Sequence, residues 1–399
     1  MQLINKLDEK LEIIKFTHLD ELLTTALSSQ AAVAIVRMQL IAQQQKLFEA
    51  FIKLINNAID EKSPHTAGHC ERVPIITMMI AESLNRINYG PFKDFNLTNK
   101  DFYELEIASL LHDCGKITTP VHIVDKGTKL ETITDRIKNI STRFLNLQTQ
   151  IFGECVEAKL ALRPCIVPHE EQKVEKYYRD RLKQLKEEYE FVAHCNTGSE
   201  KTDDEDIDKL KKIRAKHQFT DSNGVEQHIL TQDELTNLSI IYGTLTNEER
   251  NVINYHITST IKMLESLPWP KHLKNVPEFA GGHHERMDGK GYPRGIAAKE
   301  MSVQARAMAV ADVFEALTAP DRPYKKGHML STALDIMGNM TKGGHLDPDI
   351  FQVFIDEKIY LNYAKKYLAE SQLDDVDITK IPGFVPNVTK LENAKSLND

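Results

Sequence analysis

Eight histidine and aspartate side chains occupy positions that core or loop packing alone would not favour. Imidazole nitrogens and carboxylate oxygens suit a hard-to-borderline divalent metal ion, and such a site needs no cysteine thiolate. The candidates are His65, His69, His112, Asp113, His256, His283, His284 and Asp312. The sequence therefore predicts a metal centre built from segments that lie far apart along the chain.

The first two candidates share a predicted helix. Ser63 followed by Pro64 is typical of a helix start, because the Ser hydroxyl caps free amides and Pro fits the first turn. His65 and His69 are four positions apart, so both side chains lie on one face and can reach one ligand. A pair of surface histidines is the alternative interpretation.

The later candidates come from three further segments. His112 and Asp113 end a helix predicted from about residue 102, and a carboxylate beside an imidazole can bridge two metal ions. The pair His283 and His284 lies in the glycine-rich loop 281–295, where glycines permit a tight loop close to a ligand. Asp312 lies in the apolar run 308–314 and should be buried, so it needs a cation or a salt-bridge partner.

Together these segments resemble the HD-GYP branch of the HD-domain phosphohydrolases. The resemblance rests on the pair His112-Asp113, on Lys116, and on the complete HExxDGxGYP motif at residues 284–293. It extends through residues 311–318 and 321–325 and covers about half of the chain. A pattern of this length is very specific.

The resemblance implies a centre of two or three divalent metal ions, usually iron or manganese. Asp113 would be the bridging carboxylate. Some family members carry a Glu four residues before the first ligand, where it helps to bind a third ion, whereas this sequence has His65. The metal count is therefore left open between two and three, and the implied ligands are His69, His112, Asp113, His256, His283, His284 and Asp312.

The implied reaction is hydrolysis of a cyclic dinucleotide in bacterial second-messenger signalling. The substrate is cyclic di-GMP, opened to pGpG and further to GMP, or the mixed cyclic GMP-AMP. Two metal ions can hold a shared hydroxide in line with the phosphorus, with Asp113 between them. Lys116 is the best candidate to protonate the departing ribose oxygen.

Basic and aromatic side chains near the motif are candidates for substrate contacts. Arg322 and Lys325 match family positions that contact phosphates and bases, and Arg294 is a further candidate whose alternative is a solvated surface charge. Tyr292 and Tyr324 either contact substrate or anchor the loop structurally.

The elements that must position these residues are predicted to be helices. Residues 1–60 have few Gly or Pro and carry apolar residues at helical spacing. From Ile133 to Leu162 apolar residues recur at alternating four and three steps, which indicates a long helix with a coiled-coil seam. A second charged helix follows Pro168 and would form an antiparallel hairpin with the first. Strand signals are scarce, so the predicted fold is all-α.

An unusual spacing predicts a large insertion. The family links the HD motif to the next ligand by a short connection, whereas His112 and His256 are 144 positions apart. Residues 126–130 and 243–246 both resemble the one family turn. We therefore predict an N-terminal helical segment at 1–60, a catalytic domain at 61–130 plus 243–365, a helical insertion at 131–242 and a C-terminal tail at 366–399.

Composition limits the location and the partners. The formal charge of the 399-residue chain is -8, which does not favour a nucleic-acid polymer, and five cysteines without a CxxC pair suit a reducing cytoplasm. The apolar stretch 22–42 is interrupted by Arg37 and falls short of a membrane span, and no signal peptide is expected. A homodimer through residues 1–60 or through the hairpin is a hypothesis. The charged hairpin is interpreted as a solvated face, with a protein partner as the alternative.

Two other functions are compatible with these residues. One is an HD-type hydrolase acting on nucleotides or nucleoside triphosphates, against which the intact Gly-Tyr-Pro loop argues. The other is a non-catalytic scaffold that responds to a cyclic dinucleotide, although all the expected ligands for catalysis are present.

Overall fold

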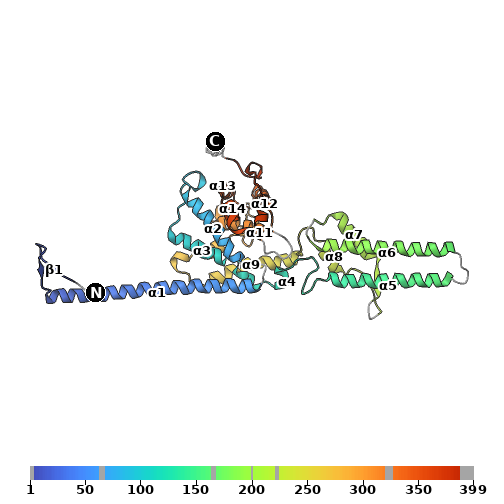
Figure 1. Ribbon diagram of the computed structural model, residues 1–399, viewed down its shortest axis with the longest axis horizontal. Helices are drawn as coiled ribbons and strands as arrows, with labels where there is room; N and C mark the ends of the chain where they lie inside the picture. The colour runs from blue at the N-terminus through green and yellow to red at the C-terminus, as the bar shows by residue number, and fades with distance from the viewer. Residues whose placement is uncertain are drawn as a thin grey trace. The chain divides into compact units, whose positions relative to one another are not determined.

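The structure, a computed structural model, describes residues 4–62, 68–162, 168–198, 201–220, 224–319 and 327–386 (Figure 1). These residues are predominantly helical and contain only two short antiparallel hairpins, so the all-α prediction is confirmed. The helices are α1 (His18–Lys62), α2 (His69–Arg86), α3 (Asn99–Leu111), α4 (Val121–Val124), α5 (Ile137–Leu162), α6 (Pro168–Asn196), α7 (Asp204–Lys216), α8 (Gln232–Leu238), α9 (Asn247–Glu265), α10 (Val276–Gly281), α11 (Val303–Thr318), α12 (Leu330–Lys342), α13 (Pro348–Asp356) and α14 (Ile359–Tyr367).

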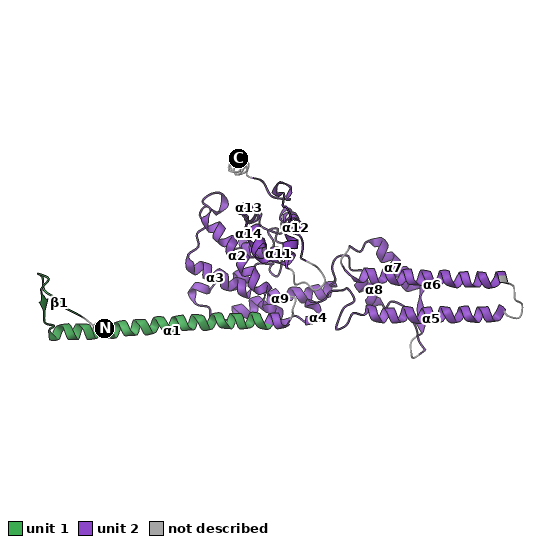
Figure 2. Cartoon of the chain, in the orientation of Figure 1, with its two compact units in different colours: residues 1–58 green, residues 59–399 purple. Residues whose placement is uncertain are grey.

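The chain divides into two compact units, Met1–Ala58 and Ile59–Asp399 (Figure 2). In the first unit, β1 (Lys6–Leu7) pairs with β2 (Ile13–Ile14) ahead of α1. The prediction of a helix throughout residues 1–60 is therefore wrong for residues 4–17. The physical reason is a local turn in which the Asp8 carboxylate accepts the backbone N–H groups of Lys10 and Glu12, both at 2.9 Å.

The core that carries the functional segments forms where α2 packs against α11. Val73, Ile76 and Ile80 recur at three and four steps on α2 and are completely buried. They pack in one cluster with Val310 and Phe314 of α11, which are also completely buried. Burial of each such side chain stabilises the fold by roughly 1.5–3 kcal/mol. The cluster therefore holds residues near position 70 against residues near position 312.

Capping fixes where two of the positioning helices begin. Thr98 and Asp101 form a capping box at the start of α3, and Thr246 and Glu249 form one at the start of α9. In each box the hydroxyl and the carboxylate satisfy amides that the helix leaves free. The boundaries that place the last residues of α3 and the middle of α9 are thus set by local sequence.

A second buried cluster lies wholly between residues 130 and 238. Helices α5 and α6 lie side by side (Figure 1), and Ile140, Phe144, Leu147 and Ile151 of α5 are buried, as the alternating four and three spacing predicts. Ile133, at the start of the predicted seam, precedes the helix and is 93% exposed. The polar composition of residues 196–235 predicts a loop region with one short helix around residues 206–217. The described residues of this stretch contain that helix as α7, and in addition the start of α8 and the hairpin β3 (Gln218–Thr220) with β4 (Glu226–His228).

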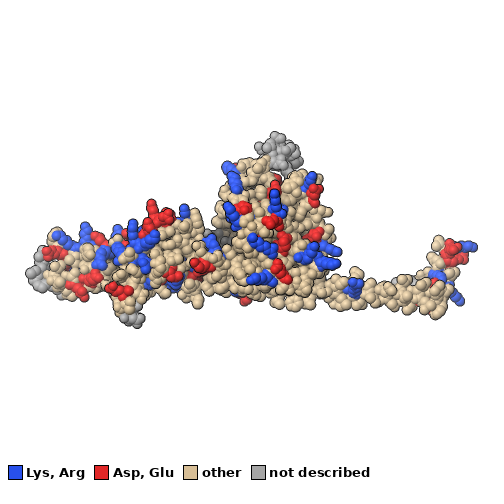
Figure 3. Space-filling view, turned by 180° about the vertical axis from the view of Figure 1, so that it is seen from behind, with Lys and Arg blue, Asp and Glu red and all other residues tan. Residues whose placement is uncertain are grey.

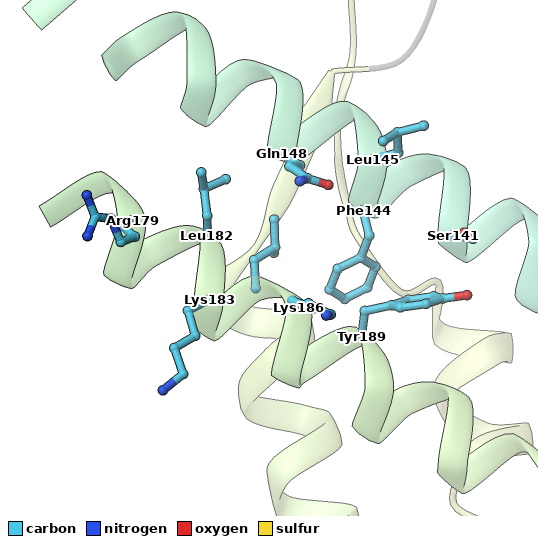
Figure 4. A pocket seen from close by; sticks show the side chains of 10 residues that line it. Ser141, Phe144, Leu145, Gln148, Arg179, Leu182, Lys183, Lys186 and Tyr189 are labelled. Carbon is cyan, nitrogen blue, oxygen red and sulfur yellow. The ribbon is translucent and has the colours of Figure 1, made fainter. Parts of the chain in front are cut away.

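A pocket of about 650 Å³ opens between α5 and α6 (Figure 4). Phe144, Leu182 and Tyr189 form apolar walls, while Arg179 and Lys183 are among its polar lining. Tyr189 packs on Phe144 with ring centroids 5.4 Å apart. No candidate ligand of the metal site lines this pocket.

Two buried lysines connect the start of the predicted insertion to its end. Lys126 Nζ lies 2.7 Å from the Glu249 carboxylate of α9 and donates to Asn237 Oδ1 at 3.1 Å. Lys129 Nζ donates to Thr202 Oγ1 at 2.5 Å and to the backbone carbonyls of Leu238, the last residue of α8, and Ile240. The two chain segments that bound residues 131–242 are therefore held together by charge-assisted hydrogen bonds.

Candidate metal centre

Seven of the eight predicted ligands come together, although they lie on five separate segments. One group contains Asp113, His256, His283 and His284, and the other contains His69, His112 and Asp312. Within each group one ligand atom from every residue lies within 4.8 Å of the others. His65 lies outside the described residues. His112 and Asp113 are neighbours in sequence, but they belong to different groups.

Asp113 lies between the two groups. Its Oδ1 is 3.1 Å from Nε2 of His256, and its Oδ2 is 3.2 Å from Nε2 of His69 and 3.3 Å from Nε2 of His112. One carboxylate oxygen therefore faces each group, which is the arrangement of a carboxylate that bridges two ions. The carboxylate is only 2% exposed, so bulk water does not compensate its charge.

The ring nitrogens of three histidines indicate that the site accepts a cation. In each ring Nδ1 donates to the backbone carbonyl oxygen of the residue three positions earlier. His112 donates to Ser109 at 2.7 Å and His283 donates to Ala280 at 2.6 Å. His256 donates to Ile253. A carbonyl only accepts, so in a neutral ring each Nε2 presents a lone pair to the centre.

Buried nitrogen and oxygen atoms near the centre show whether these side chains suit a bound metal ion. Nε2 of His256, Nε2 of His283 and Oδ1 of Asp113 are buried and make no hydrogen bond to the described residues. Burial lowers the pKa of His283 well below its ordinary value and lowers the pKa of His284 to about 4, so both rings are neutral near pH 7. Neutral imidazoles and a carboxylate oxygen that accepts no hydrogen bond match a metal ion.

A carboxylate outside the ligand groups orients the first histidine. Nδ1 of His69 hydrogen-bonds to the Glu315 carboxylate, which also accepts from Arg72 Nε at 2.6 Å. Glu315 is 1% exposed and lies one helical turn after Asp312 on α11. Sequence reasoning did not assign Glu315 a role. The available signal was a second acidic residue in an apolar helix, three positions from a predicted ligand.

A pocket of about 270 Å³ opens onto both ligand groups. Its lining includes the predicted residues Lys116 and Tyr292, together with Arg72 and Glu315, which the sequence did not single out. Arg294 does not line it, and its guanidinium lies 3.5 Å from the Glu265 carboxylate. The predicted substrate contacts Arg322, Tyr324 and Lys325 lie outside the described residues.

Comparison with known proteins identifies the fold that carries this centre. Two HD-domain family models match the chain, at residues 66–162 and 231–350. The cyclic di-GMP phosphodiesterase PA4108 of Pseudomonas aeruginosa is 39% identical over 113 residues, which is 28% of this chain and 26% of that protein. The 3'3'-cGAMP-specific phosphodiesterase 1 of Vibrio cholerae is 44% identical over 96 residues, which is 24% of this chain and 22% of that protein. The chain belongs to the HD-GYP family.

The matches also show where this HD-GYP protein differs from its relatives. The aligned region spans about a quarter of the length of the relatives named above. Residues 163–230 are matched by neither HD model, and they fall inside the segment that we predicted to be an insertion. The insertion boundaries at 131 and 242 stay a prediction.

A glycine holds the segment that follows the His112-Asp113 pair close to α9. We call this segment, residues 113–119, the HD loop. Gly115 N donates to Thr260 Oγ1 at 2.9 Å, and a Cβ added at Gly115 would lie 2.0 Å from the carbonyl oxygen of His256. Only glycine allows this approach. The close contact explains how Asp113 reaches the histidine on α9.

Lys116 follows on the short 3-10 helix Cys114–Thr118 and pairs with the Asp113 carboxylate. Burial by itself would lower the pKa of Lys116, but the charge of Asp113 outweighs burial and raises it. For Asp113 burial would raise the pKa, but the charge of Lys116 opposes burial and the pKa lies well below the ordinary value. Lys116 is therefore protonated and Asp113 ionised across neutral pH.

Glu285 fixes the conformation of the loop that contains the motif at residues 284–293, which we call the GYP loop. The buried Glu285 accepts the backbone N–H of Arg294 at 2.7 Å and of Ile296 at 3.2 Å. Tyr292 stacks on His284 with ring centroids 4.9 Å apart and an interplanar angle of 17°. The motif therefore places an aromatic ring directly beside a candidate ligand at the pocket.

Proposed function

We propose that this protein is a metal-dependent phosphodiesterase that hydrolyses a cyclic dinucleotide in bacterial second-messenger signalling. The observation that carries the proposal is the position of Asp113 between two groups of buried histidines, beside a protonated lysine. The names of the aligned relatives, which are cyclic di-GMP and 3'3'-cGAMP phosphodiesterases, support the substrate class. The products are the linear dinucleotide pGpG, and further GMP, or the linear form of cyclic GMP-AMP.

The residues suit two divalent ions, which we propose to be iron or manganese. Asp113 would be shared, with one ion on the side of His69, His112 and Asp312. The other ion would lie on the side of the second group, which contains His256, His283 and His284. Bound ions of this kind supply an activated hydroxide and neutralise charge on the phosphate. His65 is the candidate ligand for a third ion.

Other side chains position the candidate ligands or donate a proton. Glu315 orients His69, and Glu285 and Tyr292 fix the loop that carries His284. Lys116 holds a proton on Nζ at the wall of the pocket and delivers it to the departing ribose oxygen.

Further basic side chains complete the proposed substrate site. Arg72 lines the pocket, pairs with the Glu315 carboxylate and is proposed to contribute positive charge to the substrate site. Arg322, Tyr324 and Lys325 are proposed to contact phosphates and bases, with Arg294 as a weaker candidate.

The first experiment combines metal analysis with product analysis. Protein purified without oxygen is assayed for iron and manganese, then incubated with cyclic di-GMP or cyclic GMP-AMP, and the products are separated by chromatography. We expect two or more ions per chain and linear dinucleotide from the wild type, with no product from Asp113→Ala. Metal-replete wild-type protein that leaves both substrates intact would contradict the proposal.

The same assay resolves the base preference and the competing functions. The ratio of kcat/KM for the two cyclic dinucleotides identifies the preferred substrate. Turnover of nucleoside triphosphates without turnover of either cyclic dinucleotide would identify another HD-type hydrolase. Binding without turnover in both wild type and Asp113→Ala would identify a scaffold.

Further proposals concern the cellular location and the oligomeric state of the protein. We propose that the enzyme acts in the cytoplasm and as a homodimer, with the inserted helices 131–242 as the candidate surface for a protein partner. A light-scattering mass equal to the 45.5 kDa monomer would contradict the homodimer.

A further inference from the structure

A groove runs between α5 and α6 on one side of the inserted hairpin. It contains the pocket of about 650 Å³ described above, whose lining residues all come from these two helices (Figure 4). Phe144 and Leu185 are its most buried lining residues, each only 4% exposed. A cavity of this size with apolar and aromatic walls is typical of a binding site. The groove is therefore a candidate site outside the metal centre.

The two helices line this groove with rows of the same repeat. The α5 row contains Ser141, Leu145 and Gln148, and the α6 row contains Arg179, Lys183 and Lys186. Each row takes a step of four and a step of three, so its side chains stay on one side of the helix. One further step of four along α5 leads to Phe152, which is 62% exposed. Adjacent rows with this repeat form a surface along which a third helix can pack.

The basic row of α6 faces no acidic residue across the groove. Residues 137–153 of α5 contain neither Asp nor Glu. Each cation instead pairs with a glutamate of its own helix four positions away, at 2.9 Å for Arg179 and at 3.8 and 3.7 Å for the two lysines. The three basic side chains are 73%, 76% and 78% exposed, and pairs of this kind are weak. A partner that brings carboxylates would therefore meet cations that α5 does not match.

The opposite side of the hairpin is matched by the chain itself. Arg181 and Glu188 lie about half a turn around α6 from Arg179. Arg181 pairs with Glu154 of α5 at 2.7 Å, and Glu188 pairs with Lys216 of α7 at 2.8 Å. Two described elements of the chain thus supply partners on that side, whereas no residue of α7, α8 or the hairpin β3–β4 lines the groove.

The spacing of the cations favours an extended partner over a compact anion. Arg179 and Lys186 are seven positions apart, which is about 10 Å along a helix. The charged ends of Arg179 and Lys183 point in different directions (Figure 4). A single phosphate group requires donors that converge on it. An acidic helix instead presents carboxylates at intervals along its length.

Other extended partners fit the groove less well. The formal charge of the chain is -8, and Figure 3 shows Lys and Arg side chains interspersed with carboxylates on one face of the hairpin. Neither feature favours a nucleic-acid polymer. A flat bilayer surface would leave the buried end of the pocket at Phe144 unfilled, whereas apolar side chains of a helix can enter it.

We propose that this groove binds an amphipathic acidic helix of a protein partner. Its apolar side chains fill the pocket at Phe144, Leu182 and Tyr189, and its carboxylates pair with the basic row of α6. The inference deepens the partner surface proposed above for residues 131–242 by specifying its face and the chemistry of the partner. It does not depend on catalysis. Failure of the phosphodiesterase assay would leave the groove in place, and failure of the tests below would leave the metal centre in place.

The first test measures binding of peptides to the full chain by fluorescence anisotropy. The probe is a labelled synthetic helix of about three heptads, with leucines on one side and glutamates on both flanks of that side. The comparison peptide has lysine in place of every glutamate. We expect the acidic peptide to bind at least about tenfold more tightly than the basic one. Equal binding of both peptides, or binding of neither, would overturn the proposal.

The second test reverses the charge of the α6 row. Lys183→Glu/Lys186→Glu should reverse the preference, so that the basic peptide binds more tightly than the acidic one. Lys173→Glu/Lys211→Glu is the matched control, because it changes the net charge equally at two exposed lysines outside the pocket lining. Circular dichroism checks that both variants keep their helices. A preference that survives in the first variant, or that reverses equally in the control, would exclude the basic row as the contact.

The third test locates the bound peptide. A photo-crosslinking group on a central leucine of the acidic peptide should label residues 141–152 or 179–189 of the full chain. Labels confined to other parts of the chain would contradict the proposal. Wild-type protein that binds phosphatidylglycerol vesicles or single-stranded RNA, but neither peptide, would assign the basic row to lipid or nucleic acid and also overturn it.

Discussion

His69 and Glu315 are 246 positions apart, yet Nδ1 of His69 hydrogen-bonds to the Glu315 carboxylate in a buried contact between α2 and α11. This bond fixes which nitrogen of His69 faces Asp113 and Asp312. Nε2 of His69 lies 3.2 Å from an oxygen of each. Carboxylate partners of this kind control both the tautomer and the orientation of a metal-binding imidazole.

Replacing Glu315 with Gln should therefore weaken metal binding. We expect an affinity about 10–100-fold lower, because an amide neither holds the ring as firmly nor compensates its charge. Titration of metal-free protein with Mn²⁺ measures the change. Glu82→Gln, an exposed position on α2, is the control. Equal affinities for both variants would show that Glu315 does not position His69.

Replacing Lys116 with Met should slow the reaction without loss of metal. If Lys116 protonates the leaving ribose oxygen, kcat falls by roughly 10²–10⁴. Hydrolysis of bis-p-nitrophenyl phosphate should fall much less, because its leaving group departs without a proton. A similar loss on both substrates, at full metal content, would mean that Lys116 binds the substrate and does not donate the proton.

Replacing Lys62 with Met should disturb the HD loop from outside the pocket. Lys62 Nζ donates to the carbonyl oxygens of Lys116 at 3.3 Å and Thr119 at 2.6 Å, and also to that of Ile117. Loss of these bonds should cost about 1–3 kcal/mol in the local stability of that segment. Hydrogen exchange at residues 115–119 should rise, and kcat should fall with KM little changed. Lys53→Met, exposed on the same helix, should leave exchange at these residues as in the wild type.

Replacing Gly115 with Ala should separate the HD loop from α9. The added Cβ would lie 2.0 Å from the His256 carbonyl oxygen and 2.5 Å from the Thr260 amide nitrogen, so backbone must move. We expect metal content and kcat both to fall at least about tenfold, in line with a shift of about 1 Å at the reacting groups. Gly153→Ala is the matched control, because nothing lies within 4 Å of its added Cβ. Full activity of Gly115→Ala would refute the close approach.

The inserted helices should lose stability in acid. Burial would raise the pKa of Glu234, but its hydrogen bonds with Arg143 outweigh burial and lower it. A lowered folded-state pKa means that the stabilisation is present above the ordinary carboxyl value, about 4.3. It is lost as the pH falls through the folded-state pKa. The protection of amides in α5 and α8, measured relative to the intrinsic exchange rate at each pH, should therefore fall below about pH 4.5 in the wild type. Glu234→Gln should show weaker pH dependence, and identical profiles would exclude this pair as the cause.

Much of the site followed from sequence because its motifs are local. The pairs His112-Asp113 and His283-His284, and the motif at 284–293, carry their residue types and spacing within a few positions. The alternating steps of α5 likewise predicted its buried side. Helical periodicity was less informative before residue 18, where Asp8 makes a turn by binding neighbouring amides. That competition between side chain and backbone has no periodic signal.

By itself the sequence determined the all-α fold, the types of the candidate ligands and the family. Tertiary structure decided how the candidate ligands are grouped: His112 joins His69, while its neighbour Asp113 lies between the groups and faces His256. It also decided that Glu315 orients His69 and that Lys62 binds the HD loop. These contacts join residues more than 40 positions apart through packing of α2, α11 and the end of α1. Spacing along the chain cannot report them, because packing free energy depends on which surfaces meet and not on their separation in sequence.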